Sequence, residues 1–137
     1  MSTEVIRQLA PLIEAGDHPY LQGAWTPLLE EVNATDMPVL SGKIPDDIDG
    51  IYLRNTQNPV YRSIGRYHPF DGDGMMHALH VSDGGARYLN RWIETSAFEG
   101  EAVAGESESP GVMGPFDYSI SPFGIKDTSN TDVFALN

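Results

Sequence analysis

The chain has 137 residues, 40% of them hydrophobic, with 20 acidic and 8 basic side chains and a formal net charge of −12. It is long enough for one domain at most, and without cysteine it has no disulfide, thiolate metal ligand or cysteine nucleophile. The acidic balance disfavours nucleic acid as a partner, because phosphate backbones are bound by clustered Lys and Arg. No apolar run approaches the ~20 residues that cross a bilayer, and the first residues lack the pattern of a signal peptide, so we expect a cytoplasmic protein without a transmembrane segment.

Residues 1–17 are expected to form a helix that precedes the main domain. Apolar side chains recur at helical spacing between Thr3 and Ala15, and Gly16 suits the position just past a helix end. Pro11 lies inside this pattern and favours a kink or a shorter helix. Residues 18–137 are then expected to form the main domain, which is mainly β.

The middle of the chain has the pattern of short strands and turns. Proline and glycine interrupt residues 18–49, which favours extended chain and turns over a long helix. Strands are predicted at residues 50–54 and 66–70, with a turn at residues 55–59 between them. Residues 75–81 and 86–93 predict a hairpin. Both faces of its first strand carry apolar bulk, so we expect that strand to lie between two layers, as in a sandwich or a propeller blade.

The last third of the chain is expected to be mostly irregular. Residues 94–108 contain five Glu and no Lys or Arg, which predicts a solvated loop. The following residues are rich in Gly, Pro, Ser, Asp and Asn, and strand character resumes only at residues 132–136.

The candidate metal ligands are the histidines and the aspartates near them: His18, His68, His77, His80, Asp71 and Asp73. His77 and His80 are three residues apart and point to opposite faces of a strand, so we expect hydrogen-bonded imidazoles and no metal site here. Residues 71–74 read Asp-Gly-Asp-Gly, like the opening of a calcium loop, but the later oxygen ligands are missing. We expect a tight turn in which both glycines have positive φ and both aspartates cap backbone amides. With no nucleophile elbow or phosphate-binding glycine loop, no residue is assigned a catalytic role.

Three segments carry a combined pattern that is more specific than any of its parts. The first signature segment, residues 44–59, contains Ile-Pro-Asp-Asp-Ile-Asp-Gly-Ile-Tyr-Leu-Arg-Asn followed by Asn-Pro at 58–59. The second, residues 67–77, reads Tyr-His-Pro-Phe-Asp-Gly-Asp-Gly-Met-Met-His, and the third, residues 126–133, reads Lys-Asp-Thr-Ser-Asn-Thr-Asp-Val. From about residue 19 onward the chain thereby resembles the N-terminal part of the carotenoid cleavage oxygenase family, which includes lignostilbene dioxygenases and the retinoid isomerase of the visual cycle. Residues 55–58 read Asn-Thr-Gln-Asn where family members usually have Asn-Gly-Pro-Asn, so the turn there is expected to differ.

The resemblance implies a seven-bladed β-propeller with a non-haem Fe(II) held on its axis by four histidines. It also implies that dioxygen cleaves a C=C bond of an apolar conjugated substrate to two carbonyl products. The iron-binding histidines of the family lie beyond the third signature segment, so none of this chain's histidines matches a ligand position and no iron is expected in this part. Phe70 matches a position that can face the substrate cavity in stilbene-cleaving relatives, and His77 is expected to be structural.

Three functions remain open at this stage. In the first, the chain is the N-terminal portion of an Fe(II) dioxygenase acting on a carotenoid, apocarotenoid or stilbene, and is inactive alone. Alternatively, it is a self-contained small β module that binds an apolar ligand or a partner protein without catalysis. The third possibility is an acidic calcium-binding module centred on Asp71 and Asp73.

Overall fold

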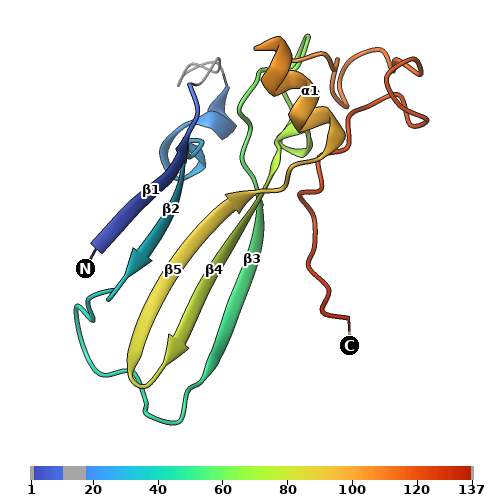
Figure 1. Ribbon diagram of the computed structural model, residues 1–137. Helices are drawn as coiled ribbons and strands as arrows, with labels where there is room; N and C mark the ends of the chain where they lie inside the picture. The colour runs from blue at the N-terminus through green and yellow to red at the C-terminus, as the bar shows by residue number, and fades with distance from the viewer. Residues whose placement is uncertain (1, 11–17, 137) are drawn as a thin grey trace.

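The computed structural model describes residues 2–10 and 18–136. Its five strands form one antiparallel sheet in the order β1-β2-β5-β4-β3 (Figure 1). The strands are β1 Ser2–Gln8, β2 Glu30–Thr35, β3 Gly50–Gln57, β4 Gly74–Ser82 and β5 Gly85–Trp92. The helices are α1 Ser96–Ala104 and three short 3-10 helices, η1 Pro19–Leu21, η2 Gly23–Trp25 and η3 Pro69–Asp71. Among the described residues, no helix has both the length and the apolar character needed to cross a membrane.

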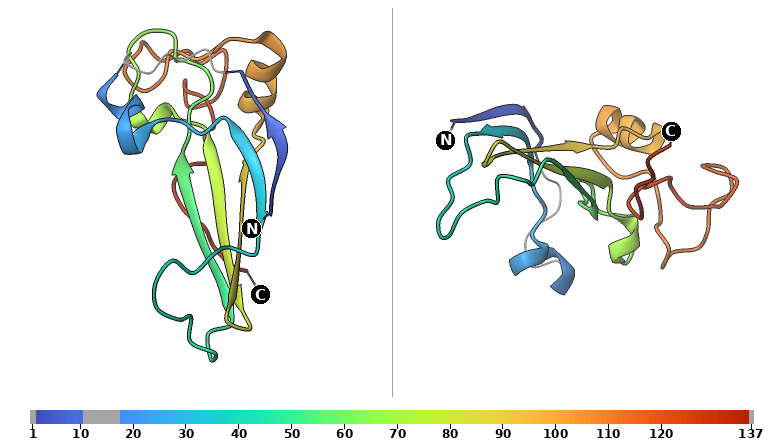
Figure 2. Two further views of the ribbon diagram at one scale, coloured as in Figure 1. Left: turned by 90° about the vertical axis from the view of Figure 1, so that its left-hand side faces the viewer. Right: turned by 90° about the horizontal axis from the view of Figure 1, so that it is seen from below.

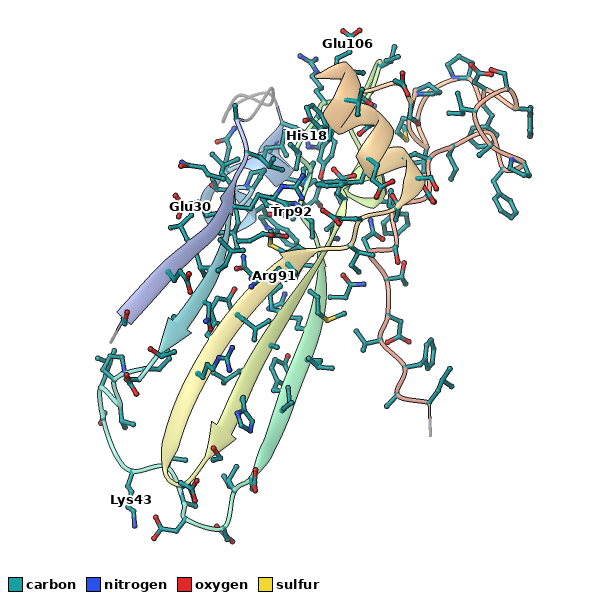
Figure 3. All side chains as sticks on the ribbon, viewed as in Figure 1. His18, Glu30, Lys43, Arg91, Trp92 and Glu106 are labelled. Carbon is teal, nitrogen blue, oxygen red and sulfur yellow. The ribbon has the colours of Figure 1, made fainter. Side chains whose placement is uncertain are left out.

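The sheet is covered unevenly along its length. Helix α1, the 3-10 helices and most of the loops gather at one end, while the β4–β5 turn extends away from them at the other (Figures 1 and 2). The hydrophobic core lies at the covered end and consists of Val60, Tyr61, Met75, Trp92 and Phe98. Figure 3 shows Trp92 where the sheet meets α1.

The β4–β5 hairpin confirms the clearest prediction from the sequence. The two strands pair from Met75 opposite Trp92 to Ser82 opposite Gly85. Asp83 and Gly84 in the turn have φ of 50° and 70°, the positive values that a two-residue hairpin turn requires. The expected second layer is not present among residues 2–10 and 18–136, which contain this one sheet.

The predicted N-terminal helix is wrong for residues 2–8, which form β1. Strand β1 pairs with β2 from Ser2 opposite Thr35 to Gln8 opposite Glu30. The backbone amides and carbonyls of these residues form hydrogen bonds with β2 in place of the hydrogen bonds within a helix. Pairing with a distant strand therefore outweighs the helical preference that the spacing of apolar residues indicates. The rest of that predicted helix, residues 11–17, lies outside the described residues.

Two further strand predictions are wrong. Residues 66–70 do not form a strand: Pro69 begins η3, and the His68 imidazole accepts the backbone N–H of Phe70 to cap it. Residues 132–136 also lack strand structure, because no described strand pairs with them. In contrast, the strand predicted at residues 50–54 is longer than expected and continues to Gln57, so residues 55–57 belong to β3 and not to a turn.

The predicted loop over residues 94–108 contains α1. The Thr95 hydroxyl accepts the backbone N–H of Phe98 at 3.2 Å and caps the helix start, and Gly105 ends the helix with φ of 75°. Phe98 is 1% exposed and stacks on Trp92 with ring centroids 6.1 Å apart. The contact between Phe98 and Trp92 therefore stabilises a helix in a segment whose charges alone predict a solvated loop.

Candidate ligand-binding site

The turn over residues 68–74 is built by its two aspartates. Asp71 accepts the backbone N–H of His68 at 2.9 Å through Oδ2 and that of Val112 at 2.8 Å through Oδ1. Asp73 accepts the backbone N–H of Val60 at 3.2 Å. Both carboxylates cap amides, as expected, and these bonds explain their burial without a calcium ion.

The expected positive φ at the glycines of this turn is wrong, since neither Gly72 nor Gly74 has one. Gly72 is extended, with φ of −67° and ψ of 140°. Glycine is required here for close approach: a Cβ on Gly74 would overlap the backbone carbonyl of Ser129. The second and third signature segments are thus packed backbone to backbone.

A buried ionic cluster joins the turn, α1 and the third signature segment. Lys126 Nζ lies 2.9 Å from Asp73 Oδ1 and 2.9 Å from Glu101 Oε2, and the three side chains are 5%, 2% and 2% exposed. Burial lowers the pKa of Lys126, but Asp73 and Glu101 more than offset it, so the net direction is upward. Ser107 Oγ donates to the other Glu101 oxygen at 2.8 Å. The cluster is therefore a charged, hydrogen-bonded connection between three parts of the chain.

Side-chain amides complete the junction of the three signature segments. Asn55 Nδ2 on β3 donates to the Ser129 carbonyl at 2.9 Å. Asn130 Nδ2 donates to the carbonyls of Gly72 at 2.7 Å and Phe70 at 3.1 Å. Segments more than 50 residues apart in sequence therefore meet at one place, and the backbone carbonyls of Phe70 and Gly72 are held there.

Phe70 lies between two cavities. Its side chain is 65% exposed, and it shares with Gln57 the lining of both. The signature cavity has a volume of about 470 Å³ and is lined by residues that include Asn55, Gln57, Phe70, Lys126, Thr128 and Asn130. The aromatic cavity has a volume of about 410 Å³ and is lined by residues that include His18, Tyr20, Trp25, Tyr67, His68 and Phe70. Volumes of this size suit parts of a small-molecule ligand.

The histidines are dispersed. His18 and His68 each accept a backbone N–H two residues ahead through Nδ1. His77 and His80 lie on opposite faces of β4, where they pair with Arg54 and Ile51 of β3 respectively. Among the residues that the structure describes, no group of three or more His, Cys, Asp or Glu side chains could hold a metal ion. These residues do not fit an iron site, and we derive no step through iron from them.

His77 is held in a small polar cluster on the sheet. Its Nε2 lies 2.9 Å from Thr56 Oγ1 and its Nδ1 lies 2.7 Å from the Tyr88 hydroxyl. Burial, and then the nearby Arg54 guanidinium, lowers the pKa of His77, so the imidazole is neutral at pH 7. It joins β3, β4 and β5, as a structural histidine would.

Sequence reasoning missed Glu101, the role of Lys126, and the rings that line the aromatic cavity. Thr95 followed by Phe98 and closed by Gly105 is a local helix signal that identifies the segment carrying Glu101. Nothing local indicates that Lys126 reaches Asp73, 53 residues earlier.

The structure defines a β protein with a ligand-sized cavity at the junction of three signature segments. The sequence profile of the family described as retinal pigment epithelial membrane protein matches residues 25–137. The chain belongs to this family, which is the carotenoid cleavage oxygenase family that the three signature segments indicate.

Curated relatives and solved structures agree with this assignment. The chain is 50% identical over 82 residues to a carotenoid cleavage oxygenase of Mycobacterium tuberculosis, covering 58% of this chain and 16% of the relative. It is 41% identical over 91 residues to a carotenoid 9,10(9',10')-cleavage dioxygenase of Phaseolus vulgaris, covering 66% of this chain and 17% of the relative. The crystal structure of Pseudomonas brassicacearum lignostilbene dioxygenase superposes with a TM-score of 0.64 at 26% identity, covering 69% of this chain and 20% of that one. The chain thus spans about a sixth to a fifth of the length of these enzymes.

Proposed function

We propose that this chain is the N-terminal part of a non-haem Fe(II) dioxygenase that cleaves a C=C bond of an apolar conjugated substrate, a carotenoid, apocarotenoid or stilbene. The observation that carries the proposal is the junction at Phe70, where all three signature segments of an oxygenase family meet beside ligand-sized cavities. One C=C bond and one dioxygen are consumed and two carbonyl groups form, so the reaction needs no external reductant.

The surface of the chain supports a place within a larger protein. It exposes 8794 Å², whereas a self-contained monomer of 15.0 kDa is expected to expose about 7,000 Å². The excess includes both faces of β3, where Ile51 and Tyr52 are 62% and 64% exposed on opposite sides. An open edge strand with exposed apolar side chains is prone to aggregation unless it is paired or covered. We propose that other blades of a seven-bladed propeller cover it in the parent protein.

In this proposal the chain contributes a wall of the substrate cavity. The rest of the longer protein that contains it, the parent, contributes the iron site. Phe70 faces the substrate, and the hydrogen bonds of Asn130 to the backbone around it fix its position. Histidines elsewhere in the parent would hold the iron, and the iron would supply the activation of dioxygen. The chain alone is inactive, and the parent is cytoplasmic.

Iron content tests the proposal. The parent protein and the isolated 137-residue chain are purified, loaded with Fe(II) without oxygen, desalted and analysed for metal by mass spectrometry. We expect one iron per parent protein and no stoichiometric iron on the chain. Iron bound to the isolated chain, or a parent that binds none, would contradict the proposal. A monodisperse isolated chain that unfolds cooperatively and binds an apolar ligand would instead favour the self-contained β module.

A further inference from the structure

The aromatic cavity has ring walls that are fixed before any ligand arrives. His18 stacks on Tyr20, and Trp25 meets Tyr20 edge to face, in both cases with ring centroids 5.6 Å apart. His18 also meets Tyr67 edge to face at 5.6 Å, and Tyr67 is buried against Leu21. His18 lies at the covered end of the sheet (Figure 3). Fixed rings lose little conformational freedom on binding, so this wall is preorganised.

The ring faces in this wall are partly free. Tyr20 and Trp25 are 47% and 53% exposed although both lie within the ring network, and Phe70 closes the cavity on the side of the signature cavity. Half-exposed rings around a concavity offer face and edge contacts to an apolar ring of a ligand.

The chemistry of the lining favours a neutral ligand. Burial, followed by the charges of Asp71 and Asp73, raises the pKa of the Tyr67 hydroxyl, so it remains a neutral phenol. The described lining contains no carboxylate to pair with a cationic group, and its one permanently charged side chain, Arg66, would repel such a group. An uncharged, apolar ring matches such a lining better than an ion does.

The two cavities are neighbours across Phe70, since Phe70 and Gln57 line both. We propose that the aromatic cavity binds the neutral ring end group of an elongated ligand that passes Phe70 into the signature cavity, and that Tyr20 and Trp25 determine specificity for that ring. The inference rests on the proposed function, which supplies an elongated conjugated substrate.

The test compares two isomeric probes that differ in their ends: β-carotene, with cyclised ends, and lycopene, which is acyclic. Binding to the parent protein is measured in detergent without oxygen, so that no turnover occurs. The variants are Trp25→Leu and Tyr20→Leu, which keep apolar bulk and remove the ring, and Trp25→Phe, which keeps a ring. Phe123→Leu is the matched control, because Phe123 is a 78% exposed aromatic residue that lines neither cavity.

We expect each of the two ring-removing variants to weaken β-carotene binding by about 2- to 10-fold and to leave lycopene binding unchanged. Trp25→Phe and Phe123→Leu should bind both probes as the wild type does. Unchanged β-carotene affinity in both leucine variants, or an equal loss for both probes, would overturn the inference while leaving the proposed function intact. A wild-type parent that bound neither probe nor a stilbene would overturn the proposed function, and this inference with it.

Discussion

Removing the charge of Lys126 should destabilise the chain strongly. In Lys126→Met the carboxylates of Asp73 and Glu101 stay buried, each side chain 2% exposed, and lose the ammonium 2.9 Å away. Breaking a buried ion pair by removing one partner costs about 3–5 kcal/mol. That is a large share of the roughly 5–15 kcal/mol by which a domain is stable. We expect the midpoint of thermal unfolding of the parent protein to fall well below that of the wild type.

Urea unfolding of the parent protein, followed by circular dichroism, measures this loss. Lys43→Met is the matched control, because it removes an ion pair to Asp46 whose side chains are 74% and 77% exposed, and it should change the free energy of unfolding by less than about 1 kcal/mol. Adding Asp73→Asn and Glu101→Gln to Lys126→Met should recover part of the loss, since no unpaired charge then remains in the cluster. If Lys126→Met costs no more than Lys43→Met, the reasoning about the cluster is refuted.

The pH dependence of this effect has a defined sign. The pKa of Lys126 is raised in the folded chain. The stabilisation is therefore fully present below the ordinary lysine pKa and is lost as the pH rises through the raised value. Lys126 therefore stays protonated in the folded wild type from pH 6 to 9, and its own contribution to stability should be constant over that range.

Three other predictions follow from single contacts. Gly74→Ala should lower stability and release the third signature segment, because the added Cβ would overlap the Ser129 carbonyl. Gly50→Ala is the control and should cause no such release, because no atom lies within 4 Å of its added Cβ. Equal hydrogen exchange of the third segment in both variants would argue against the close approach. The pKa of His77, measured by NMR titration, should lie below 6.5. Protonation of His77 should therefore reduce stability as the pH falls from 6.5 through the pKa of the folded state. A measured His77 pKa above 6.5 would contradict this prediction. Thr95→Ala should cost about 1 kcal/mol in urea unfolding through the lost cap of α1, while Thr95→Ser should cost little; equal losses would exclude the cap.

Local features of the sequence predicted the local parts of the fold. The β4–β5 hairpin follows from strand patterns on either side of a turn with Asp83 and Gly84, and the capping roles of Asp71 and Asp73 follow from turn chemistry. The hairpin turn and the bond from His68 to Asp71 depend on neighbours within a few residues, so the local sequence contains the necessary information. The local sequence does not indicate that Asp73 caps Val60 or that Asp71 also caps Val112.

The missed features depend on contacts between distant residues. Strand β1 forms because β2, more than 20 residues away, supplies its hydrogen-bond partners. Helix α1 is fixed by the burial of Phe98 on Trp92, and Lys126 finds its two carboxylates 25 and 53 residues earlier. No local pattern contains such pairings, and the family resemblance grouped the three signature segments without predicting that they meet in space.

Product analysis of the parent protein is the most direct test of the proposed oxygenase. The Fe(II)-loaded protein is incubated in air with a carotenoid, an apocarotenoid and a stilbene, and the products are identified by mass spectrometry. We predict that at least one of these substrates is split at a C=C bond into two carbonyl compounds, and that chelating the iron abolishes the reaction. A folded, iron-loaded parent that leaves all three classes intact would contradict the proposed function.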